Sequence, residues 1–158
     1  MSPPLLEISR GLYASLIADL ARSGAGVAEA GAFLLGAPSD DRRLITSYLL
    51  YEEVAPQSHR QHDYVAFTAE ETARAWDHCY RKGVQVLADV HTHPFGPPQS
   101  PSDRAHPIVS LAGHVALIVP YFALRDPRPC DLGVHVFLGQ GRWCSLFDAD
   151  AAQAVQLT

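Results

Sequence analysis

Short apolar blocks separated by polar turns recur along the chain and predict strands and helices in alternation. Residues 5–8 suit a short strand, and Ser9 can cap a helix that ends at Gly24. The apolar residues of this helix recur every three or four positions and are Leu12, Leu16, Ile17 and Leu20. Two β-prone apolar runs follow, over residues 32–36 and 43–54, and together they predict a hairpin.

The middle of the chain carries a pattern of strand, helix and strand. After a polar loop, residues 64–67 predict a short strand. Thr68 and Glu71 have the spacing of a capping box and predict a helix that ends at Gly83. The apolar face predicted for this helix consists of Ala73, Trp76 and Tyr80. The next apolar run, 84–90, predicts a strand, so we expect a crossover and some parallel pairing.

The last third of the chain predicts one more helix and three more strands. A short helix is expected over residues 103–110, followed by a strand over 114–119. Residues 133–138 and 142–146 flank a Gly-Gln-Gly turn and predict a second hairpin. The last dozen residues suit a short helix or a tail. This order of elements predicts an α/β (α+β) fold.

Length and composition fit one globular domain over residues 1–158, with 47% hydrophobic and 18% charged residues. No apolar run has the length of a membrane span, and no secretory signal is visible, so we expect a cytoplasmic protein without a membrane partner. The net charge of −5 and the scattered basic residues argue against nucleic-acid binding. Three cysteines without a CxxC pair are expected to be buried free thiols, namely Cys79, Cys130 and Cys144.

The segment 91–103, HTHPFGPPQSPSD, concentrates the candidate chemistry. It follows the strand predicted over 84–90, so His91 and His93 lie where a buried strand gives way to a loop. Residues two apart on an extended backbone point to the same side, so both imidazoles can bind one ion. Asp103 can add an oxygen ligand and leave a fourth tetrahedral position for water, as in catalytic zinc sites.

The residues around the His-x-His pair distinguish it from other metal sites. A cupin would have a glutamate where Pro97 and Pro98 stand, and a metallo-β-lactamase would have an aspartate and a histidine where Phe95 and Gly96 stand. The string DVHTH at 89–93 fits an amidohydrolase, but such barrels need about 250 residues. Two histidines and a carboxylate also bind non-haem iron, so the metal remains open at this point.

The remaining histidines of the middle third have supporting or solvated positions. His106 and His114 are interpreted as supporting or core histidines, and His106 is close enough to orient the carboxylate of the site if its segment is helical. His59 and His62 lie in a polar loop and are interpreted as solvated, rather than as a second metal site with Cys130.

The segment HTHPFGPPQSPSD resembles the His-x-His, Pro, Gly, Ser-x-x-Asp signature of the JAMM (JAB/MPN) metallopeptidases. Glu29, in the string EAGAFLLG, resembles the upstream glutamate of that family. The order of elements agrees over about residues 5–146. The resemblance implies the MPN/JAB fold, a curved mixed β-sheet flanked by helices with a cytidine-deaminase-like architecture.

The resemblance also implies a role for each residue of the motif. The ligands of one Zn²⁺ per chain would be His91, His93 and Asp103. Glu29 would act as the general acid and base, and Ser100 would help to hold the tetrahedral intermediate. Ser100 is preferred to Ser102 because it keeps the Ser-x-x-Asp spacing. The sequence departs from the family in two places: six residues separate His93 from Ser100 where seven are expected, and Ala32 replaces a glycine.

The function implied is that of a zinc-dependent isopeptidase or peptidase of the prokaryotic stand-alone type. It would hydrolyse the amide bond at the C-terminus of a ubiquitin-like protein, in deconjugation or in precursor processing. Its partners would be that protein or its conjugate, and activating (E1-like) or conjugating (E2-like) proteins of the same pathway. The alternatives are a metal-free scaffold in a larger complex and a zinc hydrolase of small amides or amino-acid conjugates.

Overall fold

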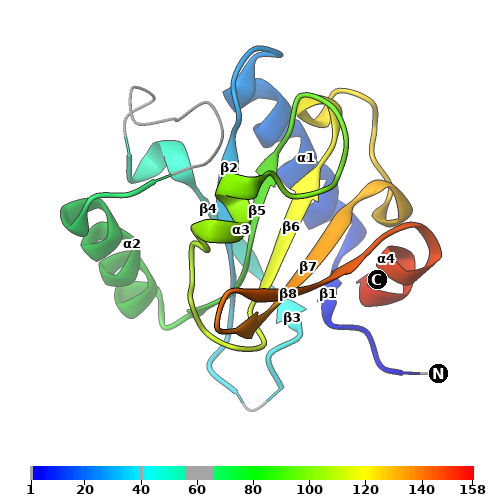
Figure 1. The fold of residues 1–158 in the computed structure, drawn as a ribbon. Helices are drawn as coiled ribbons and strands as arrows, with labels where there is room; N and C mark the ends of the chain where they lie inside the picture. Colours follow the sequence, from blue (N-terminus) through cyan, green and yellow to red (C-terminus); the bar gives the residue numbers. More distant parts are fainter. Residues whose placement is uncertain (1, 40, 56–65) are drawn as a thin grey trace.

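A computed structural model describes residues 2–39, 41–55 and 66–158 of the chain. A six-stranded sheet forms its centre, with strand order β4-β2-β5-β6-β7-β8 (Figure 1). The strands are β2 (Gly31–Gly36), β4 (Ser47–Leu50), β5 (Gln85–Thr92), β6 (Val115–Val119), β7 (Gly133–Gly139) and β8 (Arg142–Leu146). Strands β5 and β6 run parallel, and the other neighbours in this sheet are antiparallel. The mixed sheet agrees with the predicted α/β class, and both predicted hairpins are present as β2–β4 and β7–β8.

A second, three-stranded sheet has the order β3-β1-β9, and its strands run parallel. They are β1 (Leu6–Ile8), β3 (Leu44–Ile45) and β9 (Val155–Leu157). Strand β9 follows the helix α4 (Asp148–Ala154), so the last dozen residues form both a helix and a strand. This strand was not predicted, and it pairs with β1 from the other end of the chain.

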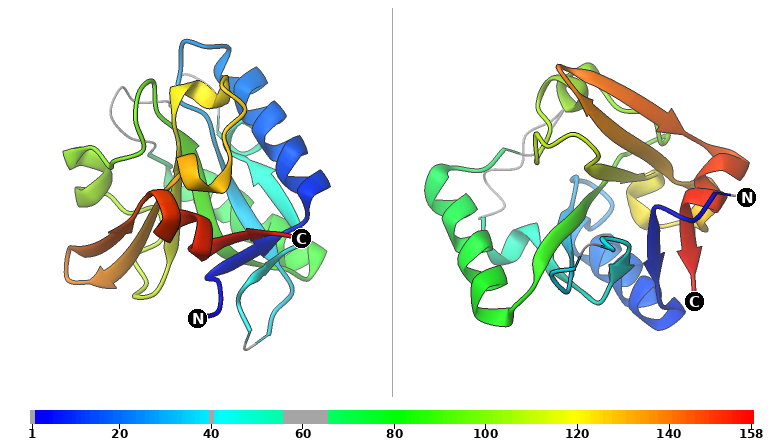
Figure 2. Two further views of the ribbon diagram at one scale, coloured as in Figure 1. Left: turned by 90° about the vertical axis from the view of Figure 1, so that its right-hand side faces the viewer. Right: turned by 90° about the horizontal axis from the view of Figure 1, so that it is seen from below.

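Two longer helices cover opposite faces of the main sheet (Figure 2). Helix α1 (Arg10–Gly24) begins where predicted, since the Ser9 hydroxyl accepts the N–H of Leu12 at 3.1 Å. Helix α2 (Ala69–Lys82) has the predicted capping box, with Thr68 and Glu71 bonded in both directions at 2.8 and 3.1 Å. Among the described residues, none of the helices is long and apolar enough to cross a membrane.

Each helix buries a separate apolar cluster against the sheet. The cluster on the α1 face includes Leu16, Leu20, Leu34, Val90 and Leu117. The cluster on the α2 face includes Phe33, Leu35, Leu49, Tyr51 and Cys79. The sheet is therefore held between two apolar layers, which makes it a rigid base for the loops at its edge.

The face predicted for helix α2 is wrong. Its buried residues are Glu71, Ala75 and Cys79, whereas Trp76 is 45% and Tyr80 is 87% exposed. Two of the buried positions, Ala75 and Cys79, hold small side chains, and the large aromatic residues are left on the flank and outer side of the helix. The prediction from apolar periodicity placed these aromatic residues on the buried face because they are large and hydrophobic.

The crossover before β5 is present, but it starts from another strand than the one predicted: helix α2 connects β4 to β5, and both strands run antiparallel to β2 and so in the same direction. Residues 64 and 65 lie outside the described part of the chain, and residues 66 and 67 are not in a strand. The run expected as one strand over 43–54 divides into β3, β4 and a 3₁₀ turn at Tyr51–Glu53. Parallel pairing does occur, but between β5 and β6, on either side of helix α3 (Pro101–Ala105). This helix ends earlier than expected because a proline follows His106.

The three cysteines have different environments, and the expectation of buried thiols holds only for Cys79. Cys130 is half-buried and Cys144 is exposed. Cys144 lies in β8, a strand at the edge of the main sheet, where one side of the strand faces outward.

Candidate metal centre

The two histidines lie at the C-terminal end of β5, a central strand of the main sheet. The strand extends through Thr92, because β2 and β6 continue to pair with it on both sides: His91 lies opposite Gly31 in β2 and opposite Ile118 in β6. His93 is the first residue beyond the strand. Its N–H donates to the carbonyl oxygen of Val119 at 2.9 Å, so its backbone is held as firmly as that of a strand residue.

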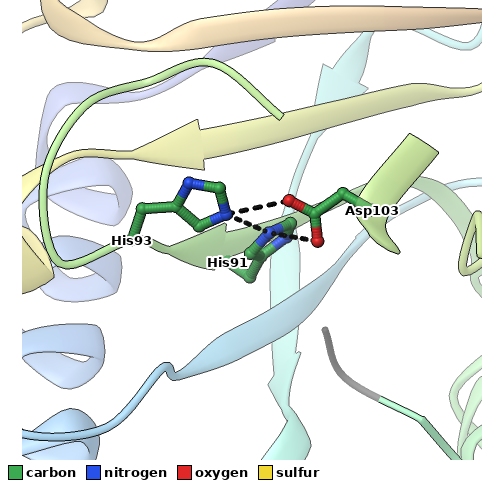
Figure 3. A group of neighbouring side chains, drawn as sticks. All are labelled: His91, His93 and Asp103. Carbon is green, nitrogen blue, oxygen red and sulfur yellow. Dashed lines mark hydrogen bonds and ion pairs between the residues drawn. The ribbon is translucent and has the colours of Figure 1, made fainter. Parts of the chain in front are cut away.

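The side chains of His91, His93 and Asp103 converge on one buried point (Figure 3). The two Nε2 atoms lie 3.1 Å apart, and Nε2 of His93 lies 2.9 Å from Oδ2 of Asp103. Nε2 of His91 lies 3.4 Å from Oδ1 of Asp103. All three residues are at least nine-tenths buried. The structure thus brings together the three residues that the sequence predicted as ligands.

This arrangement fits a metal ion. Tetrahedral zinc with ligands at about 2.0–2.1 Å places neighbouring ligand atoms about 3.3 Å apart, close to the three separations in this group. Two imidazole nitrogens that point at each other need a shared proton or a cation between them. Two nitrogens and one carboxylate oxygen form a donor set that suits zinc or ferrous iron.

The Ser-x-x-Asp spacing is a capping box that places Asp103. Ser100 is the N-cap of α3: its hydroxyl accepts the N–H of Asp103, and its own N–H donates to the Asp103 carboxylate, both at 3.0 Å. The carboxylate is therefore fixed at the start of the helix and turned toward the histidines. Ser100 rather than Ser102 has this position, and the shortened loop before it still lets Asp103 reach both imidazoles.

The charges of the group stabilise one another. Burial alone would raise the pKa of Asp103, but hydrogen bonds from His91 and His93, together with the Ser100 N–H, hold it well below its usual range. Burial would likewise lower the pKa of His91, but the hydrogen bond and charge of Asp103, followed by the charges of Glu29 and Asp89, raise it. The Asp103 carboxylate is therefore ionised and available as a ligand.

Glu29 lies beside the group without joining its tight triangle. It is 9% exposed, and its Oε1 atom lies 3.7 Å from Nε2 of His93. The residue after it, Ala30, donates its N–H to the hydroxyl of Thr92 at 2.9 Å and accepts the N–H of Thr92 at 2.8 Å. The segment with Glu29 is thus bonded to the residue between the two histidines.

Other predicted histidines are not among the three converging ligands. Nδ1 of His106 lies 3.1 Å from the carbonyl oxygen of Ser102, and this side chain is exposed instead of being packed beside the metal group. His114 is buried, with Nε2 2.7 Å from Oδ2 of Asp89, as a core histidine. The interpretation of His59 and His62 as solvated lies outside the described residues.

His135 is a supporting residue that the sequence did not identify. It is 1% exposed, and its Nε2 lies 3.0 Å from the carbonyl oxygen of Pro97. Pro97 lies in the middle of the loop between His93 and Ser100, which we call the metal loop. A carbonyl oxygen only accepts, so Nε2–H donates to it, and Ser145 Oγ–H donates to Nδ1 at 2.8 Å. The sequence places His135 between two valines of a predicted strand, which indicates a buried histidine. This pattern does not indicate which residue the histidine bonds to.

Tyr51 belongs to the core cluster on the α2 face. Its ring covers Gly31, where a Cβ atom would overlap the ring and lie 2.7 Å from the Val90 carbonyl oxygen, so only glycine fits there. The Tyr51 hydroxyl is buried without a hydrogen-bond partner among the described residues. Burial, and then the charges of Asp89 and Asp103, raise the pKa of this hydroxyl well above its usual value.

Comparison with known proteins places these features in a family. A sequence profile described as "Prokaryotic homologs of the JAB domain" matches residues 10–120, which include Glu29, His91, His93, Ser100 and Asp103. A curated relative, the "Probable metalloprotease y4jG" of Sinorhizobium fredii (strain NBRC 101917 / NGR234), is 36% identical over 63 residues. That match covers 40% of this chain and only 38% of the relative's length.

Two solution structures share the fold at low sequence identity. Protein DSY2949 from Desulfitobacterium hafniense superposes with a TM-score of 0.63 and 15% identity, over 97% of this chain and 94% of its own. A protein from Salinibacter ruber (strain DSM 13855) superposes with a TM-score of 0.58 and 18% identity, over 90% of each chain. These likenesses support the arrangement of helices and strands.

Proposed function

The chain belongs to the prokaryotic homologs of the JAB domain, the JAMM (JAB/MPN) family, and on this premise we propose that it is a zinc-dependent peptidase. Its substrate in this proposal is the amide bond at the C-terminus of a ubiquitin-like protein. The convergence of His91, His93 and Asp103 on one buried point, with the Glu29 carboxylate beside it, carries the proposal. The probable metalloprotease relative supports the same class of activity.

His91, His93 and Asp103 would hold the zinc. The bound metal would lower the pKa of a water molecule toward about 7 and polarise the scissile carbonyl. The protein fixes the three donors before any ligand arrives, through the strand pairing of β5 and the capping box of α3. Preorganised ligands lose little freedom on binding, which favours a stable site.

Glu29 is suited to moving the proton. Its carboxylate lies 3.7 Å from Nε2 of His93, near the ligands but outside hydrogen-bond distance of that atom. In the proposed reaction it takes a proton from the attacking water and delivers it to the nitrogen of the leaving amine as the carbon–nitrogen bond breaks. Hydrolysis then yields a carboxylate on the ubiquitin-like protein and a free amine.

Ser100 has two functions in this proposal. It places Asp103 through the capping box, and its hydroxyl is assigned to the oxygen that becomes negative in the tetrahedral intermediate. The substrate would be presented as a free ubiquitin-like protein with a C-terminal extension or as its conjugate. Proteins of the activating (E1-like) or conjugating (E2-like) kind are the partners expected in the same pathway.

The test combines turnover with metal content. We expect the zinc-loaded protein to cleave a C-terminal fusion of a ubiquitin-like protein, and Glu29→Gln to abolish cleavage while it retains about one zinc per chain. Glu70→Gln is the matched control, because Glu70 is an exposed glutamate at the start of α2. Undiminished turnover in Glu29→Gln would overturn the role of Glu29. Hydrolysis of small amides, with no cleavage of any fusion, would favour a small-amide hydrolase instead.

A further inference from the structure

A pocket of about 490 Å³ adjoins the metal loop, within the size range of pockets that hold small ligands. It lies between the metal loop, the loop that follows β6 and the start of α4. Its apolar wall includes Pro97, Pro120, Tyr121, Leu132 and Phe147. None of the residues that line it belongs to the metal-binding group, so the pocket needs a separate explanation.

The pocket is attached to the metal loop by hydrogen bonds on two sides. On one side, the carbonyl oxygen of Pro97 accepts the Nε2–H of His135 at 3.0 Å. On the other side, the N–H of Tyr121 donates to the carbonyl oxygen of Phe95 at 3.0 Å. Both Phe95 and Pro97 lie between the ligands His93 and Asp103. A molecule held in the pocket is therefore held in a fixed position relative to the metal loop.

Tyr121 lies in a run of three left-handed residues, which ends at Ala123, with φ values of 54°, 53° and 63°. Residues other than glycine rarely adopt this conformation, which costs free energy at each position. In this conformation the N–H of Tyr121 donates to the carbonyl oxygen of Phe95 at 3.0 Å. The N–H of Phe122 donates to the carbonyl oxygen of His93 at 2.8 Å. This unusual backbone shapes the pocket wall and fastens it to the site.

The pocket contains a guanidinium group held in place. The Cζ atom of Arg125 lies 3.7 Å from the centroid of the Tyr121 ring, so the cation stacks on the ring. Within the part of the chain that the structure describes, no carboxylate lies within ion-pair distance of Arg125. A stacked guanidinium offers parallel N–H donors to a carboxylate, which it binds in a bidentate manner.

Two aspartates line the same pocket, namely Asp131 and Asp148. One cation, two carboxylates and an apolar wall complement a ligand with a carboxylate, an ammonium group and an apolar side chain. That is the chemistry of a free amino acid or a short peptide. A simple anion would be repelled by the aspartates, and a purely apolar ligand would make no use of the charge of Arg125.

We propose that this pocket binds the C-terminal residue that is released from the substrate, with its α-carboxylate on Arg125. This inference rests on the proposed peptidase function and specifies its substrate class. Hydrolysis of the last peptide bond would release an amino acid with a new ammonium group, which the two aspartates of the pocket would attract. The site then serves the removal of a short C-terminal extension. In deconjugation, by contrast, the leaving amine is a lysine side chain within a folded protein and carries no adjacent terminal carboxylate.

The test measures binding directly, so it does not depend on cleavage. L-phenylalanine and L-phenylalaninamide differ only in the carboxylate, and each is titrated into the zinc-loaded protein while NMR shifts or heat are recorded. We expect the amide to bind about tenfold more weakly than the amino acid, because it lacks the charge-assisted pair with Arg125. Arg125→Gln should weaken phenylalanine binding by a similar factor and leave phenylalaninamide binding unchanged.

Arg81→Gln is the matched control, since Arg81 is an exposed arginine on α2 that pairs with Asp77 at 2.9 Å, away from the pocket. It should leave the affinity for phenylalanine unchanged. The proposal is overturned if phenylalanine shows no saturable binding up to its solubility limit. It is also overturned if the amide binds as tightly as the amino acid, or if Arg81→Gln weakens binding as much as Arg125→Gln. Binding without cleavage of any fusion would instead count against the proposed peptidase function alone.

Discussion

Ala30 and Thr92 are joined by two hydrogen bonds, one to the Thr92 hydroxyl at 2.9 Å and one to its backbone at 2.8 Å. Thr92 is fully buried and stands between the two histidines of the site. Ala30 directly follows Glu29. The glutamate and the two histidines come from segments about sixty residues apart in sequence, and this connection sets the position of one relative to the other.

Replacing Thr92 with valine should destabilise the protein by about 1–3 kcal/mol. Valine has the same shape, but it leaves the buried N–H of Ala30 without an acceptor. Chemical denaturation of the metal-free protein measures this loss, and cleavage should fall because Glu29 is less firmly held. Thr92→Ser keeps the hydroxyl and is the control. If valine and serine variants were equally stable and equally active, the hydroxyl would have no positioning role.

Tyr51 and Tyr13 provide a matched comparison of two buried hydroxyls. The Tyr13 hydroxyl donates to the carbonyl oxygen of Pro127 at 2.7 Å, whereas the Tyr51 hydroxyl has no partner among the described residues. We expect Tyr13→Phe to lower the free energy of unfolding by about 1 kcal/mol or more, and Tyr51→Phe to leave it unchanged or raise it. Urea denaturation checks both. A clear loss of stability in Tyr51→Phe would show that its hydroxyl has a partner, such as a buried water.

His93 should be required for metal binding, and His106 should not. In the proposed function zinc binds the folded site and not the unfolded chain, so excess zinc should raise the unfolding temperature of the wild type. We expect His93→Ala to lose both the bound zinc and this shift, since Nε2 of His93 contacts both other ligands. His106→Ala should retain both, because His106 is exposed and lies against Ser102. Elemental analysis and thermal unfolding measure the two effects, and retention of zinc by His93→Ala would contradict the ligand assignment.

The sequence predicted which residues converge better than it predicted which elements of the fold cover one another. His91, His93 and Asp103 are close together in sequence, and local rules place them: strand alternation for the histidines, and a capping box for the aspartate. Glu29 required the family resemblance, because no local rule connects it to residues about sixty positions away. The structure brings it there through the pairing of β2 with β5.

Contacts between segments that are distant along the chain could not be predicted from the sequence. The bond from His135 to Pro97 spans 38 residues, and the ring of Tyr51, in the 3₁₀ turn after β4, covers Gly31. Periodicity reports which side of an element is apolar, but it does not report which element covers that side. For the same reason, Trp76 and Tyr80 were assigned to the core while Ala75 and Cys79 occupy it.

His135 should make stability depend on pH between about 6.5 and about 4. Burial, opposed by the hydrogen bond to Pro97, lowers the pKa of His135 to about 4. In the unfolded chain its pKa is about 6.5, so the unfolded state takes up a proton first as the pH falls. The contribution of the neutral histidine is complete above about 6.5 and is lost as the pH falls toward about 4. The gap between the two pKa values corresponds to on the order of 3 kcal/mol.

The effect of His135 is isolated by comparing variants in the presence of a chelator, so that metal release does not contribute. His135→Gln removes the titrating group, and its free energy of unfolding should fall less steeply than that of the wild type as the pH drops through this range. His106→Gln, at an exposed histidine, should follow the wild type. Parallel curves for the wild type and His135→Gln would mean that His135 has the same pKa in the folded and unfolded states, and would contradict this prediction.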